Sequence, residues 1–290
     1  MKSKVGKATH LVREVSGCAY WSVRRASASV RGLPGFLVIG AMRSGTSSLY
    51  NYLIQSRYVL PARRKEVHFF DNHYCKGRLW YQANFPTRAA ATFRRLQYRQ
   101  PVVAGEATPY YIFHPEAPSR IRAICPEAKL IALLRDPVDR ALSHYQHSVR
   151  NGYERQSFVR AINREMAWLE AGFEGGIWAP FPDAYSHQRL SYLARGLYAR
   201  QLRNWFEFFP REQLLVLSSE SMFADPHRTV REVLGFLDLP DSSLQDPAAR
   251  NVASYASMEA DLRSCLVRFF EPHNQSLYEL LGCDFGWEGT

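Results

Sequence analysis

A short loop near the start of the chain has the residue types of an anion-binding turn. Residues 40–48 read Gly-Ala-Met-Arg-Ser-Gly-Thr-Ser-Ser and follow an apolar run directly. Gly40 and Gly45 let the backbone turn so that its N–H groups converge, and the N-terminus of the helix expected next adds roughly half a positive charge. These features predict that the loop binds a phosphate-like anion through one cation and several hydroxyl residues: Arg43, Ser44, Thr46, Ser47 and Ser48.

The position of the cation separates this loop from those that bind nucleoside triphosphates. A Walker A loop places Lys and then Ser or Thr after its last glycine, whereas Thr46 follows Gly45 here and the cation stands earlier, at Arg43. That position suits a donor with one phosphate and one terminal anion. Two alternatives stay open. One is a P-loop kinase of a small alcohol, which would want a Walker lysine and a magnesium-binding acid, and the other is an ordinary strand–turn–helix of small residues.

The elements around the loop predict an α/β fold. Four short apolar runs are typical of buried parallel strands, at residues 36–39, 102–105, 130–134 and 214–217. Amphipathic patterns predict a helix after the loop and further helices over residues 137–150, 189–209, 225–237 and 257–281. Asp136 and Pro137 suit the cap and the first position of one of them. Strands that alternate with helices predict a P-loop-like central parallel sheet with helices on both faces.

Composition predicts one globular domain behind a basic leader. The chain has 290 residues, of which 46% are apolar, so it can bury a substantial core. The net charge is +10, and residues 1–31 hold seven Lys and Arg against Glu14 alone. We expect a basic N-terminal appendage over residues 1–34 and a single domain over residues 35–290. The appendage could touch an anionic membrane weakly or be a solvated leader. A nucleic-acid-binding module is the weakest reading, because no zinc or RNA-binding signature occurs.

The same sequence predicts a cytoplasmic protein of bacterial type that needs no metal. It contains no apolar run of about 18 residues and no signal-peptide core. Five scattered cysteines without a CxxC pair indicate reduced thiols. A Golgi location would require a membrane anchor outside this sequence. His144 and His147 have a spacing that metal ligands can have, but no third ligand accompanies them.

Several segments together resemble the sulfotransferase superfamily. The loop at residues 40–48 resembles its 5'-phosphosulfate-binding segment, and Leu-Leu-Arg-Asp-Pro-Val-Asp-Arg-Ala-Leu-Ser at residues 133–143 resembles its 3'-phosphate-binding segment. Three further stretches are similar to the heparan sulfate 3-O- and N-sulfotransferase branch and its bacterial relatives: Lys-Glu-Val-His-Phe-Phe-Asp at 65–71, Gly-Glu-Ala-Thr-Pro-Tyr-Tyr at 105–111 and Gly-Cys-Asp-Phe-Gly-Trp at 282–287. The resemblance implies transfer of a sulfuryl group from 3'-phosphoadenosine 5'-phosphosulfate, without a metal.

The resemblance also implies which residues hold the donor. Arg135 and Ser143 would bind the 3'-phosphate through charge-assisted and hydroxyl hydrogen bonds. A salt bridge from Arg135 to Asp139 and a surface position for Ser143 are the structural alternatives. Arg250 stands roughly where some relatives close a basic stretch over the donor. Arg43 would stabilise the charge that develops on the leaving phosphate.

Glu66 is the candidate general base for removing the acceptor proton, a role worth roughly 10²–10⁴ in rate. If residues 65–70 form a strand, Glu66 and His68 share one face, and Asp71 would orient His68 or a nearby cation. Lys65 and Asp71 are expected on the acceptor side. The alternatives are a salt bridge of Glu66 with a neighbouring cation (Arg63, Arg64 or Lys65) and a histidine that is merely packed among aromatics.

The acceptor is less well defined by the sequence than the donor. Relatives that act on heparan sulfate carry Lys where Ala107 stands here, which argues against a heparan-type acceptor. The resemblance still favours a hydroxyl, or an amine, of a carbohydrate or carbohydrate-like molecule. A lipid or a small metabolite is the other acceptor class that the sequence leaves open.

Overall fold

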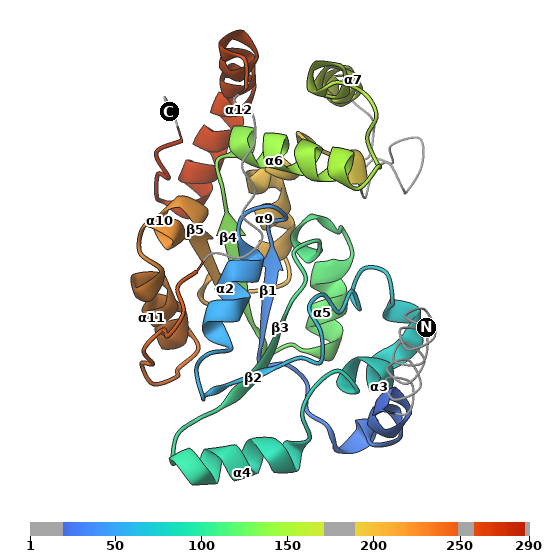
Figure 1. The fold of residues 1–290 in the computed structure, drawn as a ribbon, viewed down its shortest axis with the longest axis vertical. Helices are drawn as coiled ribbons and strands as arrows, with labels where there is room; N and C mark the ends of the chain where they lie inside the picture. The colour runs from blue at the N-terminus through green and yellow to red at the C-terminus, as the bar shows by residue number, and fades with distance from the viewer. Residues whose placement is uncertain (1–19, 171–188, 249–257, 288–290) are drawn as a thin grey trace, which may run out of the picture.

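A computed structural model describes residues 20–170, 189–248 and 258–287 of the chain. Its centre is a five-stranded parallel sheet in the order β2-β3-β1-β4-β5 (Figure 1). The strands are β1 (Phe36–Gly40), β2 (Val59–Pro61), β3 (Val103–Ala107), β4 (Lys129–Leu134) and β5 (Leu214–Ser218). The four predicted strands are confirmed. The short edge strand β2 was not predicted, because its three residues are too few to give a pattern.

Helices cover both faces of the sheet, as the α/β pattern predicts. The first half of the chain contributes α2 (Thr46–Leu53), α3 (Gly77–Gln82), α4 (Arg88–Tyr98) and α5 (Ala117–Ile124). The second half contributes α6 (Pro137–Arg150), α7 (Phe158–Glu170), α9 (Tyr198–Phe206), α10 (Ser219–Ala224), α11 (Pro226–Phe236) and α12 (Ala260–Leu281). Short 3-10 turns include η1 (Ala28–Val30), η2 (Tyr74–Lys76), η3 (Tyr111–Phe113), η5 (Ala194–Gly196) and η6 (Arg211–Gln213).

Alternate residues of the central strands build two separate cores. Leu37 and Ile39 of β1 pack with α5, α9 and α12, whereas Phe36 and Val38 pack with α2 and α11. The same alternation occurs along β4. Because successive side chains of a strand point to opposite faces, these continuously apolar runs can bury both sides of a parallel sheet. This is why the runs could be recognised as strands.

Two predicted elements differ from the structure. The helix expected over residues 189–209 has its main body only in α9, after the 3-10 turn η5. The Glu165 carboxylate accepts hydrogen bonds from the backbone N–H groups of Tyr192, Leu193 and Ala194, at 2.6, 2.9 and 2.9 Å, and these groups are therefore not available to a continuous helix. The strand considered for residues 65–70 is not formed, because that segment is irregular and His68 has φ +55°.

The described part of the predicted N-terminal appendage contacts the body of the molecule. Arg24 donates hydrogen bonds to the carbonyls of Ala83 and Phe85, and the buried Arg31 donates to Phe85 as well. Residues 1–19 lie outside the described residues, so the boundary at residue 34 stays a prediction. None of the helices within the described ranges is long and apolar enough to span a bilayer. The cytoplasmic location also stays a prediction.

Candidate active site

A cleft of about 980 Å³ opens where the carboxyl ends of β1 and β4 lead into α2 and α6. Ligand sites of parallel α/β sheets lie at this edge, where consecutive loops diverge. Four segments far apart in the sequence contribute to its lining: the loop after β1, the irregular segment after β2, the first turns of α6 and the start of α10. Most of the predicted site residues line it: Arg43, Gly45, Thr46, Ser47, Lys65, Glu66, His68, Arg135 and Ser143.

The two predicted anion sites meet at Arg43. Its Nε donates a hydrogen bond to Ser143 Oγ at 3.2 Å, and Nη1 of Arg135 donates to the Arg43 carbonyl at 3.3 Å. Asp139 forms its ion pair with Arg263 Nη1, at 2.8 Å, rather than with Arg135. The salt bridge considered for Arg135 is therefore not formed, and Ser143 is buried rather than on the surface. One wall of the cleft thus carries two guanidinium groups and a hydroxyl within one hydrogen-bonded cluster.

The loop itself is held by close packing and one buried hydroxyl. Gly45 has φ +92° and precedes the first residue of α2, and a side chain there would meet Phe223 at 2.8 Å. Ser219 Oγ donates to the Ser44 carbonyl at 2.8 Å. Thr46 and Ser47 line the cleft. Ser44 and Ser48 are fully buried and do not line it, so any contact of their hydroxyls with a donor stays a prediction.

Glu66 stands across the cleft at the centre of a chain of ionic contacts. Its Oε2 lies 3.0 Å from His68 Nε2, and its Oε1 lies 3.4 Å from Lys65 Nζ. Lys65 Nζ also donates to Ser47 Oγ at 3.0 Å, which ties the candidate base to the predicted anion-binding loop. His68 Nδ1 lies 2.6 Å from Asp71 Oδ2. Glu66 and His68 are therefore brought together as predicted, although by an irregular backbone rather than by a strand.

The electrostatics of this cluster keep Glu66 ionised. Burial by itself would raise the pKa of Glu66, but the hydrogen bond from His68 and the charge of Lys65 outweigh it and leave the pKa below its ordinary value. Burial by itself would lower the pKa of His68, yet its hydrogen bonds to Asp71 and Glu66 raise it to about 9. Burial lowers the pKa of Lys65, against the attraction of Glu66. At neutral pH the cluster therefore holds a carboxylate between two cations.

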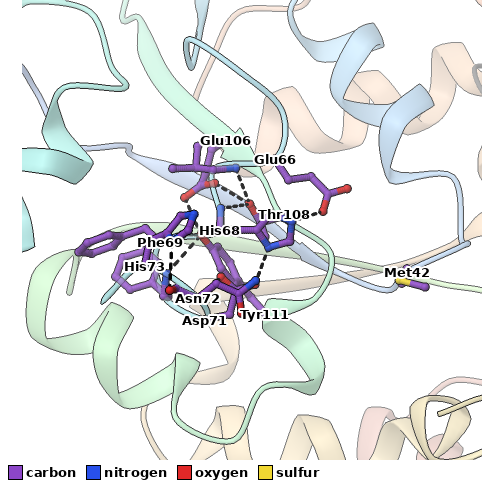
Figure 2. Close-up of polar contacts among 12 residues, drawn as sticks. Met42, Glu66, His68, Phe69, Asp71, Asn72, His73, Glu106, Thr108 and Tyr111 are labelled. Carbon is purple, nitrogen blue, oxygen red and sulfur yellow. Dashed lines mark hydrogen bonds and ion pairs between the residues drawn. The ribbon is translucent and has the colours of Figure 1, made fainter. Parts of the chain in front are cut away.

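A buried network under Glu66 and His68 fixes the irregular segment that carries them (Figure 2). Glu106, at the end of β3, accepts hydrogen bonds from Tyr81 Oη, Thr108 Oγ1 and Tyr111 Oη, at 2.5, 2.8 and 3.3 Å. Thr108 Oγ1 in turn accepts from the backbone N–H of Val67 at 3.1 Å, and Tyr111 Oη from that of Phe69 at 2.9 Å. These contacts replace the ladder that a strand would have.

Glu106 was not recognised as a site residue from the sequence. It is fully buried, and burial raises its pKa to about 7 despite the hydrogen bonds that it accepts from Tyr81 and Thr108. The sequence around Glu106 does not reveal its role, because two of its hydrogen-bond partners, Tyr81 and Tyr111, come from α3 and η3 and meet it only in the folded chain. The similarity of residues 105–111 to relatives was the available signal.

Asp71 lies behind His68 rather than in the cleft. Its side chain is fully buried, and its other oxygen, Oδ1, accepts from the backbone N–H of Asn72 at 2.6 Å. This arrangement fits the orienting role that was considered for it. Arg250 lies outside the described residues, so its place relative to the donor loop stays a prediction.

A further cationic group on the cleft wall was missed by the sequence analysis. The Arg195 guanidinium is almost fully buried, donates to Met42 Sδ at 3.1 Å and lies 4.7 Å from the centre of the Tyr110 ring. Burial lowers its pKa to about 10. His144 and His147 of α6 line the same part of the cleft. Among the described residues, no three or more His, Cys, Asp and Glu are grouped so that they could hold a metal ion.

The chain is similar in sequence to known sulfotransferases. The chain is 29% identical to the membrane-associated sulfotransferase kil1 of Dictyostelium discoideum, over 88% of this chain and 67% of that protein. It is 29% identical to heparan sulfate glucosamine 3-O-sulfotransferase 3A1 of Mus musculus, over 89% of this chain and 65% of that protein. It spans 30% of a mouse bifunctional heparan sulfate N-deacetylase/N-sulfotransferase, to which it is 31% identical over 86% of its own length.

A solved structure and a family match extend the likeness to the whole fold. The crystal structure of a sulfotransferase from Alicyclobacillus acidocaldarius superposes with a TM-score of 0.67 at 30% identity, covering 89% of this chain and all of that one. Residues 33–264 match the sulfotransferase domain family. The match covers most of the chain and agrees with the central parallel sheet, and the protein therefore belongs to the sulfotransferase domain family.

Proposed function

We propose that this sulfotransferase moves a sulfuryl group from 3'-phosphoadenosine 5'-phosphosulfate to a hydroxyl, or an amine, with Glu66 as general base. The observation that carries the proposal is the placement of an ionised carboxylate, Glu66, in the same cleft as the Arg43–Ser143–Arg135 cluster. The Glu66 carboxylate suits proton removal, and the arginine cluster suits a donor that carries two separate anionic groups.

The residues present fit such a donor. The backbone turn at Gly45, with Thr46 and Ser47 at the N-terminus of α2, would hold the 5'-phosphosulfate. Arg135 and Ser143, at the start of α6, would hold the 3'-phosphate. Arg43 lies between the two groups and would stabilise negative charge as the bond from sulfur to the bridging oxygen breaks. The 5'-phosphate then leaves as 3'-phosphoadenosine 5'-phosphate.

The proposed base has the protonation state that the step needs. The acceptor oxygen forms its bond to sulfur while its proton passes to Glu66, and the electron pair of the broken bond stays on the leaving phosphate. Because the pKa of Glu66 is lowered, the carboxylate is present at neutral pH. His68 and Asp71 hold it in place, and His68 carries positive charge that offsets the carboxylate until the proton arrives.

Lys65 would couple the base to the donor loop. It contacts both Ser47 Oγ and Glu66 Oε1, so its charge lies where the attacked sulfuryl oxygens and the incoming acceptor would meet. Lys65 would thus supply a positive charge between the donor loop and the base, in addition to the charge of Arg43. These contacts are compatible with an acceptor-binding role for Lys65, whereas the buried Asp71 would act only by orienting His68.

The acceptor class is proposed from the relatives. Several of them are named for glucosamine residues of heparan sulfate, which supports a carbohydrate or carbohydrate-like hydroxyl. The chain has Ala107, fully buried at the end of β3, where relatives that act on heparan sulfate carry Lys. We therefore expect an acceptor other than heparan sulfate, and a lipid or small metabolite is the second class.

A binding experiment separates this proposal from a kinase. Titration calorimetry of the full chain should give a dissociation constant for 3'-phosphoadenosine 5'-phosphate at least tenfold lower than for ATP with magnesium. Equal or tighter binding of magnesium ATP would contradict the donor assignment. Glu66→Gln should bind the same nucleotide within about twofold of the wild type, which keeps donor binding and base function distinguishable.

A further inference from the structure

The helix α4 projects from the far end of the sheet and presents an apolar face that no part of the described chain covers. Figure 1 shows α4 at the opposite end of the molecule from α6 and α12. None of its eleven residues is buried, and two large apolar side chains three residues apart, Phe93 and Leu96, are 65% and 72% exposed. Residues at this spacing share one helix face. Two large exposed apolar side chains on a helix without buried residues indicate a surface that binds another molecule.

Arginines surround that apolar face. Arg88, Arg95 and Arg99 are exposed on α4 or just after it, and Arg57 reaches the same region from the turn before β2. The Arg57 guanidinium stacks on Tyr98 at 5.6 Å, which joins it to α4. The helix therefore carries apolar side chains with cations alongside, the arrangement of helices that lie in the interface of an anionic bilayer.

The surrounding sequence lacks the acids that would neutralise these cations. Residues 20–105 contain fourteen Lys and Arg against only Glu66 and Asp71, both of which belong to the active-site cluster. Within the described ranges, none of Arg57, Arg88, Arg95 and Arg99 forms an ion pair with a carboxylate. Arg88 donates instead to the carbonyls of Ser29 and Arg31, which ties the start of α4 to η1 and to the exposed Val30.

We propose that α4 is a membrane-surface helix that docks the enzyme on anionic phospholipid. Phe93 and Leu96 enter the boundary between headgroups and acyl chains, and Arg95 and Arg99 face the lipid phosphates, with Arg57 beside them. A soluble acidic polysaccharide would match the arginines but would leave the two apolar side chains exposed. A bilayer covers both kinds of group at once, and this is why lipid is the occupant that fits.

Docking through α4 would leave the active site facing water. The helix leads into the amino end of β3, whereas Thr108 and Pro109, after the carboxyl end of the same strand, lead to the cleft. The amino and carboxyl ends of parallel strands lie at opposite ends of the sheet, separated by the length of the strands. The bilayer would therefore lie at one end of the sheet and the cleft at the other. The enzyme would then be concentrated at a membrane while it meets its acceptor from the aqueous side.

Vesicle sedimentation of the full chain tests the proposal. The chain should sediment with vesicles of phosphatidylcholine and phosphatidylserine and remain in the supernatant with phosphatidylcholine alone. Changing both Phe93→Ser and Leu96→Ser should weaken vesicle binding by about tenfold or more, since two apolar side chains that would enter the bilayer are lost. Changing Arg95→Gln and Arg99→Gln should weaken it by about fivefold for each charge. The matched control is Val159→Ser with Arg160→Gln, an exposed pair on α7.

Three outcomes would overturn the proposal. The wild type could fail to bind anionic vesicles, or the Phe93/Leu96 variant could bind them as tightly as the wild type, which would place the contact in another segment. The chain could also bind a heparin column through these arginines, independently of Phe93 and Leu96, and ignore vesicles. Unchanged melting temperature and unchanged affinity for 3'-phosphoadenosine 5'-phosphate show that the variants fold, and neither readout depends on lipid.

Discussion

The carboxylate of Glu66 and the imidazole of His68 form a direct ion pair, with 3.0 Å between Oε2 and Nε2. The second imidazole nitrogen is held by the buried Asp71, so that the histidine lies between two acids. This relationship defines the charge state of the candidate base.

The His68 pair should make stability depend on pH in a defined direction. The folded state raises the pKa of His68 to about 9, above its ordinary value of 6.5, because Asp71 and Glu66 stabilise the imidazolium. A raised pKa means that this stabilisation is complete below about pH 6.5 and is lost as the pH rises through about 9. The free energy of unfolding of the wild type, minus that of His68→Gln, should therefore shrink over this window. A difference that is constant or grows with pH would contradict the assignment.

Lys65 should control the acid limb of the activity profile. The charge of Lys65 helps to keep the pKa of Glu66 low, so Lys65→Met should raise that pKa and move the acid limb of kcat/KM to higher pH. The maximum rate should also fall, because one of the cations near the donor loop is removed. Arg63→Met is the matched control, since Arg63 is exposed and stacks on Trp21 instead. An acid limb that does not move would separate Lys65 from Glu66.

Glu106 should affect the site without touching any ligand. Glu106→Gln leaves one carbonyl oxygen and an NH₂ donor facing three hydroxyl donors, and an unsatisfied buried group costs about 1–3 kcal/mol of stability. Transfer should fall because residues 67–70 lose their support, while nucleotide affinity stays within about twofold. Burial raises the pKa of the wild-type carboxyl to about 7.

The sign for Glu106 is the same as for His68, because both pKa values are raised in the folded state, but the loss of stability falls at lower pH. Since its folded pKa exceeds the ordinary 4.5, ionising the buried carboxyl costs free energy between about pH 4.5 and 7, and the wild type should lose stability over that range relative to Glu106→Gln. Chemical denaturation at several pH values measures this. A wild type that gains stability relative to the variant across the same range would argue against a buried carboxyl of raised pKa.

Arg135 should report the 3'-phosphate specifically. Arg135→Ala should weaken binding of 3'-phosphoadenosine 5'-phosphate by about 10- to 150-fold, the value of a hydrogen bond to a charged group. Binding of adenosine 5'-phosphate, which has no 3'-phosphate, should change by less than about threefold. Calorimetry with the two nucleotides makes this comparison. Equal losses for both nucleotides would mean that Arg135 supports the fold of the loop rather than the 3'-phosphate.

The sequence predicted the sheet and the residues after β1 and β4 better than it predicted the conformation of residues 65–70, which carry the candidate base. Buried parallel strands are short and apolar on both faces, and Asp136 does cap α6, accepting from the N–H of Val138 at 2.7 Å. Residues 65–70 alternate like a strand, but their backbone N–H groups bond to Thr108 and Tyr111. Local alternation cannot reveal such partners, because they lie about 40 residues further along the chain.

The residues that line the cleft also differ in how far the sequence could predict them. Arg43 was predicted from its loop between a strand and a helix, whereas Arg135 and Ser143 were predicted from the resemblance of residues 133–143 to a 3'-phosphate-binding segment. Arg195 and Glu106 reach the site through tertiary packing, one against Tyr110 and the other under Thr108. Their roles follow only once the distant segments are assembled. Helix α6 shows the same effect, since it buries Ser143 and His144 while Val149 is exposed.

The most direct test of the account is transfer of labelled sulfuryl from 3'-phosphoadenosine 5'-[³⁵S]phosphosulfate into acceptor extracts rich in carbohydrates, lipids or small metabolites. The account predicts a labelled product and equimolar 3'-phosphoadenosine 5'-phosphate with the wild type. With Glu66→Gln the rate should be about 10²–10⁴ lower, although nucleotide affinity is retained, and Glu116→Gln, on the exposed surface of the molecule, should behave as the wild type. Full transfer by Glu66→Gln would contradict the assigned base, and absence of labelled product from every extract with the wild type would contradict the proposed reaction.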